Sequence, residues 1–178
     1  QYENLEMFIH AESITDEVPL ADGEMVAFMR LGNDLSENFY EIQIPLNPTQ
    51  FGATSDEEIW PTANRMELRL SLLQNIKSMV LDPNTPLPTA SADGVIFFNE
   101  SELSDDGSAS ENELRIGIKG NPSFGNVRII MLGLKNAADM DICGEVWFNE
   151  LRLSELKNQG GWAAVASVDA NLADFANI

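Results

Sequence analysis

The stretch Glu24–Leu46 reads EMVAFMRLGNDLSENFYEIQIPL and carries the clearest fold signal in the chain. In Glu24–Leu31 (EMVAFMRL) and in Phe39–Leu46 (FYEIQIPL), bulky apolar residues alternate with other residues at a period of two. Such alternation, with β-branched and aromatic side chains, is typical of half-buried β-strands. The residues between the two segments, GNDLSEN, favour a turn. The stretch therefore predicts two neighbouring strands.

The same pattern recurs on both sides of this stretch. Alternating segments bounded by Gly, Asn, Asp and Pro occur at Leu5–Ala11, Arg65–Leu70, Glu113–Lys119, Val127–Leu134 and Glu145–Leu153. Seven or eight short strands indicate a mainly β fold, an antiparallel, jelly-roll-like β-sandwich. The segment Cys143–Leu153 (CGEVWFNELRL) resembles the closing strand of carbohydrate-binding-module-like jelly rolls. Between two of these strands, Gly120–Asn126 is expected to form the loop of a hairpin.

One short helix is also predicted. From Ser71 onward the period changes, and five apolar side chains fall on one helical face: Leu72, Leu73, Ile76, Met79 and Val80. Three prolines that follow, Pro83, Pro86 and Pro88, end the helix.

Length and composition predict one main domain. The chain has 178 residues, of which 44% are hydrophobic, enough for a single good core. We expect the sandwich to occupy residues 1–157, with an acidic flexible loop near 100–112 (ESELSDDGSASEN, from Glu100), and residues 158–178 to form a linker and the start of a further strand. Because the chain starts at Gln1 and ends within an alternating run, we expect it to be a piece of a larger secreted protein.

Net charge excludes one large class of partners. Lys and Arg total 10 against 29 Asp and Glu, which gives a net charge of −19. Such a chain repels phosphate groups and anionic lipid headgroups before contact. Nucleic-acid binding is therefore not expected.

The sequence shows no catalytic site. Cys143 and His10 are the only cysteine and histidine. Cys143 is expected to be a small buried apolar side chain, and His10 a packed or edge histidine. Among 29 acidic residues, no pair stands out as the two carboxylates of a glycosidase. We therefore predict a protein that is not an enzyme.

Two weak binding signals remain. Asp139 and Asp141 supply the hard oxygen ligands that Ca²⁺ prefers, and a structural Ca²⁺ is the one cofactor considered. Trp60 lies outside a clear strand and is the best candidate for an exposed, sugar-stacking aromatic. The other aromatics weighed for this role are expected to be core residues, because most of them alternate within strands: Tyr2, Phe39, Tyr40 and Trp147.

The final segment alternates more regularly than any other. After Gly160 and Gly161, one face collects Trp162, Ala164, Ala166, Val168, Ala170 and Leu172. Polar residues occupy the other face. This run has the length of a tilted transmembrane β-strand, about 9–11 residues, although the alternation alone slightly favours an ordinary surface strand.

The run GEVWFNELRLSELKNQGGWAA, which begins at Gly144, resembles the SprA/Sov family. Two earlier segments, Ala27–Leu46 and Ile130–Asn136 (IMLGLKN), are similar to the same family. Within the run, Arg152 is expected either to pair with Glu150 two positions away or to stack or pair across strands.

The resemblance implies a function in the outer membrane. The family comprises giant outer-membrane translocons of type IX secretion and gliding motility, in which soluble insertions interrupt a very large β-barrel. The chain would then be a structural or interaction module in the periplasm or at the cell surface, ending where a membrane strand begins. Implied partners are other segments of the same translocon, a PorV-type barrel, a plug protein and secreted cargo. The alternative is a carbohydrate-binding module of a secreted surface protein.

Overall fold

The structure is a computed structural model and describes residues 2–14 and 19–156. Its strands are β1 (Tyr2–Ser13), β2 (Met25–Gly32), β3 (Phe39–Pro45), β4 (Arg65–Arg69), β5 (Ile96–Asn99), β6 (Arg115–Lys119), β7 (Ile129–Asn136) and β8 (Gly144–Leu156). Its helices are α1 (Asp56–Ile59), α2 (Leu70–Leu81) and α3 (Glu100–Leu103), with 3₁₀ turns η1 (Thr62–Asn64) and η2 (Phe124–Asn126).

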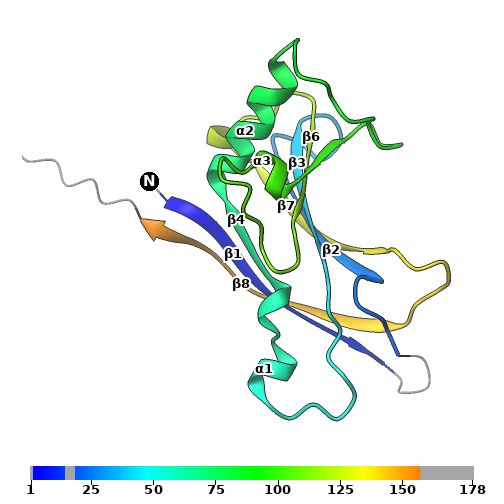
Figure 1. Ribbon diagram of the computed structural model, residues 1–178. Coiled ribbons are helices and arrows are strands. Elements are labelled where there is room, and N and C mark those ends of the chain that lie inside the picture. The colour runs from blue at the N-terminus through cyan, green and yellow to red at the C-terminus, as the bar shows by residue number, and fades with distance from the viewer. Residues whose placement is uncertain (1, 15–18, 157–178) are drawn as a thin grey trace, which may run out of the picture.

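The strands form two antiparallel sheets, so the predicted mainly β fold and the sandwich are confirmed. One sheet has the order β4-β1-β8 and the other the order β5-β6-β3-β2-β7. Figure 1 shows β1, β4 and β8 side by side, with α1 near one end of β4 and α2 at the other. The opening stretch forms the predicted pair, since β2 and β3 face each other from Val26 opposite Pro45 to Gly32 opposite Phe39.

The core lies between the sheets and follows the alternation of the sequence. Met7 and Ile9 of β1 and Met29 and Ile42 of the larger sheet are at most 1% exposed and belong to one apolar cluster. Successive side chains of a strand point to opposite faces, so their neighbours in sequence lie on the outer faces.

Helix α2 covers one open end of this core. It forms at the predicted position, and its buried residues Leu72, Leu73 and Ile76 join the same apolar cluster. Asp82 follows the helix, and the prolines beyond it prevent its continuation.

The hairpin predicted at Gly120–Asn126 is wrong. Strand β6 pairs with β3 on one side and with β5 on the other, so both of its edges are occupied. Strand β7 instead pairs with β2 at the far edge of the sheet. Strand β5 was not predicted, because its four residues lie between two irregular, polar stretches.

The acidic segment expected to be a flexible loop begins as a helix. Asn99 and Glu102 form a capping box at the start of α3, and Leu103 is 3% exposed. Glu100 is also buried, and the cost of burying its carboxylate is offset by Arg69 and by a hydrogen bond from the backbone of Ser110. Residues 104–112 lie outside helices and strands, and the flexibility of this loop stays a prediction.

The side of the sandwich between β7 and β8 exposes apolar groups. Ile130 and Leu134 of β7 pair with the core residues Leu31 and Ala27, yet they are 48% and 44% exposed. Leu153 of β8 lies opposite Leu5 and is 47% exposed. The two outer strands thus present apolar side chains that the opposite sheet does not cover.

Candidate functional site

Charged, polar and aromatic side chains lie together on the outer face of the three-stranded sheet. Because Met7 and Ile9 point into the core, the alternate residues of β1 point outward: Asn4, Glu6, Phe8 and His10. Strand β4 adds Arg65 and Glu67, which lie opposite Phe8 and Glu6. Strand β8 adds Trp147, Arg152 and Ser154, opposite His10, Glu6 and Asn4.

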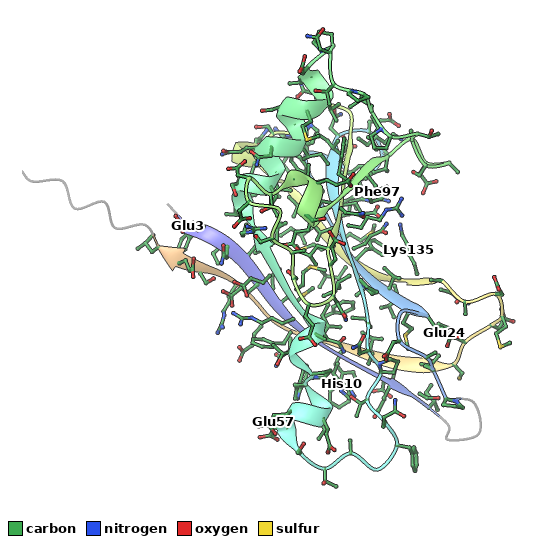
Figure 2. All side chains as sticks on the ribbon, viewed as in Figure 1. Glu3, His10, Glu24, Glu57, Phe97 and Lys135 are labelled. Carbon is green, nitrogen blue, oxygen red and sulfur yellow. The ribbon has the colours of Figure 1, made fainter. Side chains whose placement is uncertain are left out.

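An aromatic row marks the α1 end of this face. The imidazole of His10 lies between two indoles, with ring centroids 5.6 Å from Trp60 and 5.7 Å from Trp147. Its Nδ1–H donates to the carbonyl oxygen of Ile59 over 2.6 Å, and the Thr49 hydroxyl lies 3.2 Å from the same nitrogen. His10 is 4% exposed, which confirms the prediction of a packed histidine (Figure 2).

The aromatic predictions hold only in part. Phe39 and Tyr40 are core residues as expected, but Tyr2 and Trp147 are 45% and 54% exposed. Trp147 points outward because its neighbours Val146 and Phe148 take the core side of β8. Trp60, expected to be exposed, is half-buried at the end of α1.

Trp60 and Trp147 are nevertheless brought together by the structure. Both rings are tilted against the imidazole between them, by 53° and 59°. No pattern in the sequence indicates this row, since Trp60 and Trp147 lie 50 and 137 positions beyond His10. They meet only through the pairing of β1 with β8 and the return of the chain through α1.

A charge cluster occupies the centre of the outer face. The Glu6 carboxylate, 4% exposed, accepts hydrogen bonds from Arg65 over 2.8 Å, from Arg152 over 3.2 Å and from the Ser154 hydroxyl. The two guanidiniums also lie 5.6 Å and 5.7 Å from the ring centroid of Phe8. Strands β4, β1 and β8 are therefore tied together through one acid and one aromatic ring.

These contacts favour the charged form of Glu6. The hydrogen bond from Ser154 has the largest effect, burial opposes it, and the hydrogen bonds from Arg65 and Arg152 add to it. Together they lower the pKa of Glu6 from 4.5 to about 2. The carboxylate is thus an ionised anchor at neutral pH and not a proton donor.

A β-bulge places Arg152 beside Glu6. Phe8 lies opposite Asn149 but Glu6 lies opposite Arg152, so Glu150 and Leu151 share the space facing Met7. Glu150 adopts a positive φ of 53°, as the extra residue of a bulge often does. Without the bulge, Leu151 would face Glu6. Arg152 also lies 3.5 Å from Glu150, so both predicted pairings of Arg152 occur.

A second buried charge lies on the opposite side of the molecule. Glu41 on the outer face of the five-stranded sheet is fully buried and binds Lys135 and Arg30, both over 2.5 Å, and Gln43 over 2.7 Å. Burial raises the pKa of Glu41, but these hydrogen bonds outweigh it and leave the pKa below its ordinary value. Figure 2 shows Lys135 near Phe97 and far from His10.

The remaining sequence candidates are placed less favourably. Asp139 and Asp141 are exposed in the segment between β7 and β8, and the described part of the chain holds no cluster of three metal-ligating side chains. Cys143, expected to be buried, is exposed because it lies in this segment just before β8 begins. The predicted membrane strand from Trp162 to Leu172 lies outside the described residues.

Comparison with known proteins identifies the family. The model of the SprA_N family, described as motility related/secretion protein, matches residues 1–178. The chain belongs to the SprA_N family. Membership in SprA_N makes it a motility- and secretion-related protein associated with the cell envelope, and it confirms the resemblance seen in the sequence. No curated protein matches the chain. Among the described residues of this SprA_N chain, no helix is long and apolar enough to cross a membrane.

Proposed function

We propose that this SprA_N chain is a non-enzymatic interaction module of an outer-membrane protein translocon for type IX secretion and gliding motility. Its setting is the periplasm or the cell surface. The observation that carries the proposal is β8, a strand of 13 residues at the edge of its sheet. Three apolar side chains along it, Leu151, Leu153 and Leu156, are between 41% and 55% exposed.

A long apolar edge strand is unusual on the solvent-exposed surface of a folded protein. An outer strand leaves one row of backbone N–H and C=O groups without a ladder partner, and proteins normally protect such an edge. Among the described residues, β8 is protected on one side only, by β1. The segment proposed to pair with the free edge of β8 belongs to the same translocon. A PorV-type partner, a plug protein and secreted cargo are further partners proposed from the family resemblance.

The contacts of the outer face support a structural role. Glu6 and His10 are the buried titratable side chains in its centre and in its aromatic row. Each is engaged by several neighbours, the carboxylate by two guanidiniums and a hydroxyl, and the imidazole by a carbonyl and two indoles. Groups held in this way stabilise strand pairing.

The edge can be tested by Leu153→Lys in the full-length protein. A lysine on an edge strand discourages further strand pairing and is costly to bury against an apolar neighbour. We expect secretion of cargo and gliding to fall several-fold while the amount of protein in the envelope is unchanged. The matched control is Leu81→Lys at the end of α2, where the leucine is 65% exposed. Equal secretion by the two variants would overturn the proposal.

The carbohydrate-binding alternative stays a prediction. It rested on Trp60 as an exposed aromatic, and that indole is half-buried and packed beside His10. No feature of the outer face favours it over the interaction module.

A further inference from the structure

We propose that a groove at the α2 end of the sandwich binds a basic peptide segment, one in which lysine or arginine side chains adjoin apolar ones. The groove has a volume of about 560 Å³, within the range of about 300–1,000 Å³ typical of ligand pockets. It lies where β1 starts, β8 ends and α2 begins; Figure 1 shows the two strand ends side by side and Figure 2 labels Glu3 there. The proposal rests on the proposed function only for its biological setting.

Two aromatic rings form the apolar part of the groove. Tyr2 points outward at the start of β1, opposite Leu156, and Phe124 lies in η2 between β6 and β7. The two side chains line the groove and are 45% and 41% exposed, so a ligand in the groove can reach both. Segments that are far apart in the chain thus present two rings to the same space, where they offer a surface for apolar groups and for the faces of cationic side chains.

The charge of the groove is negative. Glu3, Glu67 and Glu155 line it together with a single cation, Arg69. Glu67 is partly engaged, because its carboxylate lies 3.4 Å from Arg65 and accepts a hydrogen bond from Asn4 over 3.0 Å. The Arg69 guanidinium is already committed, because it lies 3.4 Å from the buried Glu100 and donates to the hydroxyl and carbonyl oxygens of Ser108. The groove therefore attracts cations and repels acidic sugars and anionic headgroups.

The polar side chains that line the groove suit a peptide. Asn4 and the exposed Gln74 line the same space, and the Asn4 amide donates to Glu67 over 3.0 Å. The Gln74 carboxamide can donate to and accept from the backbone amide groups of a peptide. Lysine and arginine carry apolar stems that pack on rings while their charged ends reach carboxylates. A small polyamine meets the charge but offers no amide group to the Gln74 carboxamide, so a basic peptide fits the whole groove better.

The test is a binding titration of the 178-residue chain with a labelled hexapeptide. The probe is the acetylated and amidated peptide KLKFKS, followed by fluorescence anisotropy at low salt, with ELEFES as the acidic counterpart. We expect KLKFKS to bind and ELEFES not to bind. The double variant Glu67→Gln/Glu155→Gln should weaken binding about fivefold, as expected for the loss of two exposed charge contacts.

Matched variants separate the groove from the overall charge. Glu57→Gln/Glu111→Gln removes two negative charges at exposed positions outside the groove and should change the affinity less than about twofold. Phe124→Ala should weaken binding, whereas Phe51→Ala, at a side chain that is 78% exposed elsewhere, should not. Circular dichroism confirms that each variant is folded.

Three results would overturn the proposal. They are equal loss of affinity in the two charge variants, equal binding of the two peptides, and displacement of KLKFKS by spermidine at the same charge concentration. Each would show that the groove does not bind a basic peptide specifically. None would bear on the role of the β8 edge, because that role is measured by secretion and gliding in cells.

Discussion

At the scale of the residue, Glu6 shows how a sheet surface holds a buried charge. Three strands meet at its carboxylate through Arg65, Arg152 and Ser154. A buried carboxylate that keeps several charge-assisted hydrogen bonds stabilises the arrangement of its donors, and its removal leaves those donors unpaired. The same logic applies to Glu41 on the other sheet, with Lys135 and Arg30 as its partners.

Glu6 also makes the free energy of unfolding depend on pH. Its pKa of about 2 in the folded chain lies below the ordinary 4.5, so the folded state favours the charged form. The resulting stabilisation is complete above pH 4.5 and is lost as the pH falls from about 4.5 to about 2. We expect Glu6→Gln to lower the free energy of unfolding by about 1–2 kcal/mol at pH 7 and to flatten its decline in acid.

Urea denaturation between pH 7 and pH 2 measures both effects. Glu57→Gln is the control, because Glu57 is an exposed residue of the short helix α1. An acid profile of Glu6→Gln that parallels the unmodified chain would show that Glu6 does not set this dependence.

At the scale of the element, α2 joins the two sheets through one apolar face. Ile76 is fully buried in the common core, whereas Ser78 on the same helix is exposed. Ile76→Ala should lower the free energy of unfolding by about 2–5 kcal/mol, because it removes buried methyl groups and leaves a cavity. Ser78→Ala should change it by less than about 0.5 kcal/mol.

Thermal or urea denaturation followed by circular dichroism compares the two helix variants. Similar stabilities would mean that α2 is dispensable for closing the core. A large loss confined to Ile76→Ala would show that the helix is an integral part of the sandwich, not an appendage at its edge.

At the scale of the whole molecule, the net charge of −19 opposes compactness. Like charges spread over one small domain repel each other, and dissolved salt shortens the reach of that repulsion from about 30 Å at 0.01 M to about 3 Å at 1 M. We therefore expect the melting temperature to rise with sodium chloride, by about 2–4 °C for each kcal/mol of repulsion removed. A melting temperature that falls with salt would mean that ion pairs such as Glu6–Arg65 outweigh the repulsion.

The amino-acid sequence by itself determined the elements that rest on local periodicity. Six elements occupy their predicted places: the strands β1, β2, β3, β4 and β8 and the helix α2. Each can be predicted because its apolar residues recur at a period of two or of 3.6 along consecutive residues. The packed His10 and the family resemblance are also evident in the sequence. The finer assignment of a jelly roll stays a prediction.

Only the tertiary structure decided which elements meet. The partner of β7, the burial of Glu100 and the exposure of Trp147 depend on strand order, which short-range patterns do not encode. The row of Trp60, His10 and Trp147 and the bulge at Glu150 arise in the same way, from segments that are distant in the chain and become neighbours on folding. Periodicity fixes which face of a strand is apolar, whereas long-range pairing fixes what that face touches.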